Sequence, residues 1–211
     1  LRSAPALYGS AARIGAVGLG TGTLSCFSRP GEQWTFYEID PAVVEIARDP
    51  QHFTFLSHCL PQARIVLGDA RLSLARETSG AADILIIDAF SSDAVPMHLL
   101  TREAFALYRR SLQPNGTLMV HISNRHLNLQ PVVAASAHGR FHALAGIYDP
   151  LPRDLLMGAT PSRWIALSPS AAKLDELRRS TGPTFWQPLP SHSGFAPWTD
   201  DYGSILSVIK R

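Results

Sequence analysis

Three acidic residues and one glycine-rich loop each follow a short apolar segment of the chain. The loop spans residues 18–22, and the acidic residues are Glu38, Asp69 and Asp88. Carboxylates accept hydrogen bonds from hydroxyl and amino groups, and glycines let a ligand approach the backbone closely. Together these residue types could recognise a polar ligand such as a nucleoside.

The glycine loop has the pattern Gly18-x-Gly20-x-Gly22 and lies between an apolar segment and a stretch that can begin a helix. Glycine permits the sharp turn and leaves space where a Cβ atom would obstruct a ligand. A dinucleotide-binding fold prefers a third glycine at the position that Thr23 occupies. The spacing therefore favours a nucleoside without a pyrophosphate over a nicotinamide cofactor.

The three acidic residues suit three parts of such a ligand. Glu38 lies twenty residues after Gly18, where a carboxylate can accept both hydrogen bonds of a ribose diol. Asp69 can reach an adenine amino group, with Ala70 leaving room beside the ring, and Asp88 points into the same crevice. Each aspartate could instead cap the helix that follows it. The agreement of four positions in register favours a binding site.

The alternation of apolar segments with helical ones predicts the fold class. Strands that are apolar on both faces and alternate with helices indicate a parallel sheet covered on both sides. We expect a doubly wound, mostly parallel α/β sheet. The expected strands are 13–19, 34–39, 64–67, 83–88 and 117–123, followed by an antiparallel edge pair at 143–148 and 163–167. The expected helices begin near residues 23, 42, 101 and 131, and a turn is expected at 113–116.

Length and composition indicate a globular protein that acts on a small molecule. The 211 residues suit a single domain over 1–211, and 45% are hydrophobic while 17% are charged. The net charge is +2 and no Lys/Arg run occurs, so no nucleic-acid partner is predicted. The segment 181–203 is rich in proline, serine and aromatic residues, and we expect it to form an ordered loop over the site.

Cysteine usage and hydropathy bear on the surroundings of the protein. Cys26 and Cys59 are too few for a disulfide framework and lack zinc-site spacing, so we expect no metal and a reducing, cytoplasmic setting. No apolar stretch approaches the ~20 residues that span a bilayer. The chain begins at Leu1 in place of a methionine, which is compatible with a segment upstream.

Four motifs in order resemble the spermidine synthase pattern. The resemblance covers most of residues 12–125, and is closest to bacterial spermidine synthase-like domains, some of them fused behind membrane-spanning segments. Stretches like Ala94–Ala104 and Trp198-Thr-Asp-Asp-Tyr202 also recur in those domains. The four motifs are Val17-Gly-Leu-Gly-Thr-Gly-Thr23, Tyr37-Glu-Ile-Asp-Pro41, Gly68-Asp-Ala70 and Ile86-Ile-Asp-Ala-Phe-Ser-Ser-Asp93.

The resemblance implies a seven-stranded fold shared with AdoMet-dependent methyltransferases, and aminopropyl transfer from decarboxylated AdoMet to a polyamine such as putrescine. It also implies a homodimer and a membrane tether upstream. Asp88 matches the catalytic aspartate of the family, and Asp93 would steady the cationic amine. The expected nucleoside-binding residues are Gly18, Gly20, Thr21, Gly22, Glu38, Ile39, Asp69, Ala70, Asp88 and Phe90. The expected substrate contacts are His121, Asp201 and Tyr202.

Three functions remain open at this point. Spermidine synthases usually carry an aspartate at the position of Thr21, so the donor could be AdoMet and the reaction methyl transfer. The acidic pair Asp88 and Asp93 favours a cationic acceptor and aminopropyl transfer. The third alternative is a nonenzymatic domain of a membrane protein that binds a polyamine or a nucleoside, because a fold does not by itself establish a function.

Overall fold

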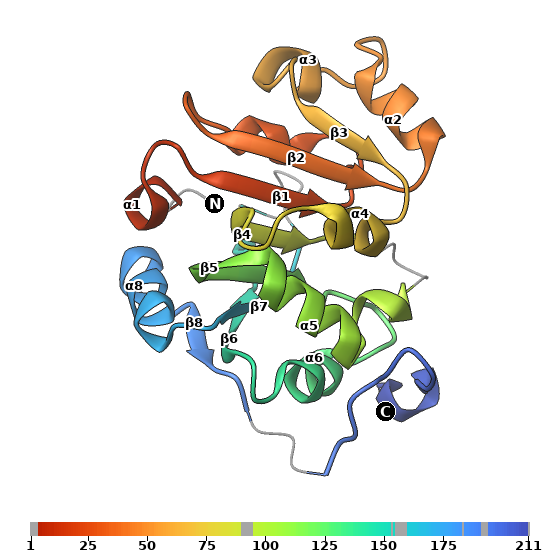
Figure 1. Ribbon diagram of the computed structural model, residues 1–211, viewed down its shortest axis with the longest axis vertical. Helices are drawn as coiled ribbons and strands as arrows, with labels where there is room; N and C mark the ends of the chain where they lie inside the picture. The colour runs from red at the N-terminus through yellow and green to blue at the C-terminus, as the bar shows by residue number, and fades with distance from the viewer. Residues whose placement is uncertain are drawn as a thin grey trace.

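The computed structural model contains one eight-stranded sheet with helices on both of its faces (Figure 1). It describes residues 4–89, 95–152, 154, 160–182, 184–190 and 194–210. The strands lie in the order β3-β2-β1-β4-β5-β7-β6-β8. Their bounds are β1 Arg13–Val17, β2 Gln33–Glu38, β3 Arg64–Leu67, β4 Ala82–Ile87, β5 Leu112–His121, β6 His142–Tyr148, β7 Ser162–Ser168 and β8 Trp186–Pro188.

Strand pairing confirms the predicted fold class. Strands β1 to β5 pair only in parallel with one another, whereas β5–β7, β6–β7 and β6–β8 are antiparallel. The two strands expected as an antiparallel pair do pair, and β7 is the one that joins the parallel part. The short strand β8 was not predicted, because a three-residue segment carries too little periodicity to be recognised.

Helices fill the connections between the strands. Their bounds are α1 Ala4–Tyr8, η1 Thr23–Phe27, α2 Pro41–Arg48, α3 Phe55–Cys59, α4 Ala70–Arg76, η2 Met97–Leu99, α5 Arg102–Ser111, α6 Gln130–Ala137, α8 Ala171–Thr181 and η3 Ile205–Val208, the η elements being 3₁₀ helices. Two of them begin after residues whose side chains cap the helix. The side chain of Asp40 caps α2, with Pro41 in the first turn, and Thr101 caps α5.

Alternate residues of the central strands point into two hydrophobic layers, one on each face of the sheet. Leu85 and Ile87 of β4 point to the face covered by α4, α5 and α6. Ile84 and Ile86 point to the opposite face, where α2 and α3 pack. All four are at most 5% exposed. Burial on both faces explains why this strand is a continuous apolar run.

Three elements differ from their sequence-based prediction. The helix expected from Thr23 is the five-residue 3₁₀ helix η1. The helix expected from about Pro131 to His142 is α6, which ends at Ala137. The turn expected at 113–116 lies within β5, whose register with β4 jumps from Ala82↔Leu112 to Ile84↔Thr117. Residues 113–116 are therefore a local irregularity of the strand and do not precede it.

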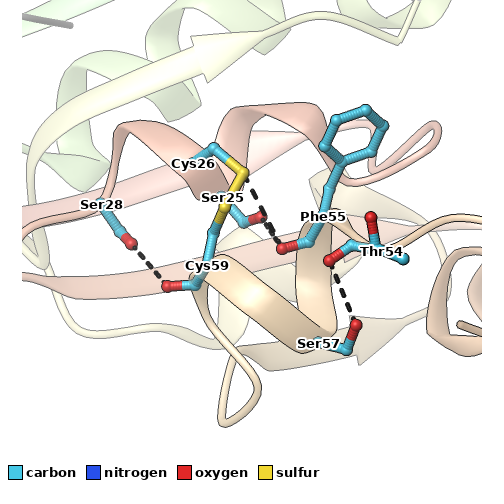
Figure 2. The surroundings of a disulfide bond; sticks show 7 residues. All are labelled: Ser25, Cys26, Ser28, Thr54, Phe55, Ser57 and Cys59. Atoms are coloured by element: carbon cyan, nitrogen blue, oxygen red, sulfur yellow. Dashed lines mark hydrogen bonds between the residues drawn. A yellow bond between two sulfur atoms is a disulfide. The ribbon is translucent and has the colours of Figure 1, made fainter.

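Cys26 in η1 and Cys59 in α3 form a disulfide, with their Cα atoms 4.8 Å apart (Figure 2). Two neighbouring hydroxyls support the same junction, since Ser25 donates to the carbonyl of Phe55 and Ser28 to that of Cys59. The two cysteines, expected to be too few for a disulfide framework, thus form one cross-link. Disulfides persist mainly in oxidising compartments, so this bond was not expected in the predicted reducing setting.

Reduction of the disulfide should destabilise the protein measurably. The bond closes a loop of sequence separation 33. The chain-entropy model gives about 3 to 4 kcal/mol for a loop of this size. Urea unfolding of the oxidised and reduced protein measures the difference, and a Cys59→Ser variant should match the reduced form. Equal midpoints with and without reductant, after mass spectrometry has verified the oxidised state, would show that the cross-link does not restrain the chain.

Candidate functional site

The carboxyl ends of four parallel strands meet at one edge of the sheet. Strand β1 pairs with β2 on one side and β4 on the other, and β2 pairs with β3. The residues that follow these strands are therefore brought together, as expected for a ligand site in an open α/β sheet. The glycine loop follows β1, and Glu38 is the last residue of β2. Asp69 comes two residues after β3, and Asp88 directly follows β4.

The glycine loop is held against two neighbouring strand ends. The amide of Gly18 donates to the carbonyl of Tyr37, and the amide of Asp88 donates to the carbonyl of Val17, both at 2.9 Å. Gly18 has φ +96°, and a Cβ atom there would lie 2.4 Å from the Asp88 carbonyl oxygen. Gly20 also has positive φ, +53°, but faces open space with no atom within 4 Å of a built Cβ. Gly18 thus serves packing, whereas the space at Gly20 is free for a ligand.

Glu38 is 8% exposed and its carboxylate is already bound by three backbone amides. Oε2 accepts from Leu19 at 2.9 Å, and Oε1 accepts from Ile39 at 2.8 Å and Asp40 at 3.0 Å. A carboxylate offers about four lone-pair sites. One therefore remains on Oε2 for a ribose hydroxyl, fewer than the two that the sequence prediction assumed.

Asp69 takes the capping role that its sequence position left open. Its Oδ1 accepts from the amide of Leu72, so it caps α4, while Oδ2 lies 3.5 Å from Nε2 of His98. Ala70, the first residue of the helix, is 8% exposed. Ile39 is 65% exposed and Thr21 half-buried, so an apolar and a hydroxyl side chain flank this part of the site.

Asp88 forms the end of a hydrogen-bonded chain of side chains. Its Oδ1 lies 2.7 Å from Nδ1 of His121, and Nε2 of His121 lies 2.7 Å from the hydroxyl of Ser123. The ring of Trp164 stacks on the imidazole with centroids 4.5 Å apart. His121 was predicted as a substrate contact, but the structure places it against the predicted catalytic carboxylate. The part played by Ser123 was not predicted, although its spacing of two from His121 puts both on one side of an extended chain.

The carboxy-terminal segment is attached beside the site by an ion pair. Asp200 accepts two hydrogen bonds from Arg71, at 2.7 and 2.8 Å, and one from the Thr101 hydroxyl at 2.7 Å. The Arg71 hydrogen bonds, helped by Thr101, lower the pKa of Asp200 to about 2. A pocket of about 380 Å³ lies at this junction and is lined by Asp201 and Tyr202, with Tyr202 70% exposed.

Beyond Asp200 the same segment continues to the loop after β5. The amide of Asn128 donates to Val208, and Nζ of Lys210 donates to the carbonyl of Asn124. Residues 198–210 thus run from α4 to the end of β5, on the side of α5 and α6 (Figure 1). Among the described residues, Asp201 and Tyr202 form no hydrogen bond or ion pair with Glu38 or Asp88. Their predicted substrate contacts therefore stay predictions.

Two predicted site residues, Phe90 and Asp93, lie outside the described residues. Within the described ranges no group of three or more His, Cys, Asp or Glu side chains is arranged to hold a metal ion. In the same ranges no helix is both long and apolar enough to cross a membrane.

Comparison with known proteins shows which sequences this chain resembles. No protein-family model matches it. It is 33% identical to a polyamine aminopropyltransferase of Vibrio vulnificus (strain CMCP6) over 115 residues, 52% of this chain and 37% of that protein. A polyamine aminopropyltransferase of Oceanobacillus iheyensis is 28% identical over 96 residues, 44% of this chain and 19% of that protein. Over these residues the chain is similar to polyamine aminopropyltransferases.

Solved structures agree on the fold of this chain. A probable spermidine synthase from Corynebacterium glutamicum ATCC 13032 has TM-score 0.65 at 21% identity, covering 92% of this chain and 74% of that one. A predicted O-methyltransferase from Agrobacterium tumefaciens has TM-score 0.53 at 19% identity, covering 76% of each chain. The methyltransferase-type fold predicted from sequence is therefore confirmed. The matched region spans well under half of the two aminopropyltransferases, 37% and 19% of their lengths.

Replacement of Gly18 by alanine should destabilise the fold more than the same change at Gly20. Positive φ costs about 1 to 3 kcal/mol for a residue with a side chain. Overpacking against the Asp88 carbonyl adds about 1 to 3 kcal/mol at position 18 alone. Urea unfolding of Gly18→Ala and Gly20→Ala measures both. Equal losses of stability would contradict the close approach of Gly18 to Asp88.

The attachment of the carboxy-terminal segment should weaken in acid. The pKa of Asp200 falls from its ordinary 3.8 to about 2 in the folded protein, so its stabilising contribution is present above about pH 4 and lost as the pH falls through 2. Hydrogen exchange of residues 198–203, relative to the intrinsic rate at each pH, should increase over this interval. Asp200→Asn should show the increase at neutral pH, whereas the matched control Asp201→Asn should not. Unchanged exchange in Asp200→Asn would refute the role of Asp200 in attaching this segment.

Proposed function

We propose that this chain binds decarboxylated AdoMet at the carboxyl edge of its sheet and transfers the aminopropyl group to a polyamine such as putrescine. The observation that carries the proposal is the position of Asp88. Asp88 directly follows β4 beside the glycine loop, and its side chain is 30% exposed. Its Oδ1 lies 2.7 Å from Nδ1 of His121. Among the described residues no side chain bonds Oδ2, which leaves that oxygen for an amine.

The nucleoside part of the donor would lie across the neighbouring strand ends. The open space at Gly20 allows the backbone to meet the ligand, and the remaining lone pair of Glu38 Oε2 would accept one ribose hydroxyl. Oδ2 of Asp69, which lies 3.5 Å from Nε2 of His98, would accept from the adenine amino group. Ile39 and Ala70 would flank the base. Phe90 belongs to the same proposal on sequence grounds.

The reaction requires a carboxylate at the position of Asp88. An alkylammonium titrates near 10.4, so at neutral pH the acceptor arrives protonated. One N–H bond breaks and its proton passes to the Asp88 carboxylate. The freed lone pair then forms an N–C bond with the carbon beside the sulfonium, and the C–S bond breaks with its electrons moving to sulfur. The products are neutral methylthioadenosine and the extended amine. Asp93, by its sequence position, would hold the cationic end of the amine.

Methyl transfer from AdoMet is the second candidate, and Thr21 is the observation that favours it. The loop residue that would hold the aminopropyl amine of the donor is a threonine in place of an aspartate. A neutral side chain there does not disfavour the carboxylate that AdoMet retains. A nonenzymatic polyamine- or nucleoside-binding domain, tethered to a membrane in a longer protein, is the third candidate. Homodimerisation and a cytoplasmic location belong to these proposals as well.

Calorimetric titration of the protein with decarboxylated AdoMet, AdoMet and methylthioadenosine, each with and without putrescine, separates the candidates. We expect the decarboxylated donor to bind most tightly, with putrescine strengthening the binding. Turnover measured as methylthioadenosine release should fall by about 10² to 10⁴-fold in Asp88→Asn, because general acid–base catalysis contributes on that order.

Asp175→Asn is the matched control, since Asp175 is an exposed residue of α8 remote from the strand ends. It should retain full turnover. Preference for AdoMet without any response to polyamines would contradict aminopropyl transfer and favour methyl transfer. Tight binding with no turnover would favour the nonenzymatic domain, and failure of all three nucleosides to bind would refute the site.

A further inference from the structure

His121 is fixed by contacts on both of its ring nitrogens and on one face. Nδ1 lies 2.7 Å from Asp88 Oδ1 and Nε2 lies 2.7 Å from the Ser123 hydroxyl. The Trp164 ring stacks on it at an interplanar angle of 19°. Trp164 is the antiparallel partner of His121 in the β5–β7 pairing, so the stack follows from the sheet register. The imidazole therefore has one defined orientation.

The donors and acceptors in this chain of contacts fit one arrangement of the protons. The backbone amide of Arg163 donates to the Ser123 hydroxyl oxygen at 2.8 Å. With its oxygen accepting there, the Ser123 O–H is free to donate to Nε2 of His121. Nδ1 then carries the ring proton and donates it to Asp88. All four groups are satisfied with a neutral imidazole and an ionised carboxylate.

We propose that His121, held by Ser123 and Trp164, is a positioning residue that keeps Asp88 ionised and directs its Oδ2 toward the acceptor amine. The proposal rests on the aminopropyl transfer proposed above, and adds a residue to that site. One carboxylate oxygen is occupied by a neutral donor, so the other is the proton acceptor. The exposed fractions of the two side chains, 23% for His121 and 30% for Asp88, place the pair at the edge of the sheet and still open to a ligand.

Two substitutions at position 121 distinguish positioning from packing. His121→Phe keeps the stack with Trp164 but removes the donor, and should lower kcat by about 10²-fold, the cost of a misplaced catalytic group. His121→Asn keeps an uncharged N–H donor, and should retain kcat within about 10-fold. His52→Asn is the control, since His52 contacts Asp49 through Nδ1 at 3.0 Å on the exposed surface. A loss of less than 10-fold in His121→Phe, or a loss in His121→Asn as large as that in His121→Phe, would overturn the proposal.

A nuclear magnetic resonance measurement tests the same contact without turnover. Long-range ¹H–¹⁵N spectra of the wild-type protein should show the Nδ1–H tautomer for His121 at neutral pH. The signals should shift in Asp88→Asn and Ser123→Ala but not in Asp175→Asn. An Nε2–H tautomer, or His121 signals that are the same in Asp88→Asn, would refute the pairing. If wild-type protein transfers no aminopropyl group, the proposed function falls, and these spectra still decide the role of His121.

Discussion

The close approach of the Gly18 backbone to the Asp88 carbonyl is the constraint on which the rest of the site depends. Gly18 joins two strand ends at once, because its amide bonds the carbonyl of Tyr37 while its α-carbon packs against residue 88. A side chain at this position would separate β1 from β4. Loss of that contact would move the glycine loop away from Asp88, and donor and acceptor could no longer meet at one place.

The surrounding structure holds this junction from several sides. The Cys26–Cys59 disulfide ties η1, which follows the glycine loop, to α3. Glu38 binds the amide of Leu19 from the neighbouring strand end. On the other side, His121 orients Asp88, and the carboxy-terminal segment runs from Arg71 to Asn124. The site is therefore assembled largely from preformed contacts, which lowers the entropic cost of ordering it around a ligand.

Local patterns predicted which residues converge at this edge better than the contacts among them. The convergence of Glu38, Asp69 and Asp88 was predicted because each ends or follows a strand, and parallel strands bring such ends to one edge. The capping role of Asp69 was foreseen as an alternative because it depends only on the next helical turn. The sheet type followed from runs that are apolar on both faces.

Contacts between distant segments could not be predicted in the same way. The pairing of Arg71 with Asp200 joins residues 129 positions apart, and the disulfide joins residues 33 positions apart. No periodicity links such residues, since only the completed fold brings them together. His121 was noticed as a residue near the pocket, but its contact with Asp88 depends on the register of β4 with β5, which a single strand does not reveal.

The most direct test of the site is a crystal structure of the protein with methylthioadenosine. We expect the ribose within hydrogen-bond distance of Glu38 Oε2 and the thioether sulfur directed toward Asp88, with the glycine loop against the ligand. A nucleoside bound elsewhere, or one whose sulfur points away from Asp88, would contradict the assignment of the four strand ends as the donor site.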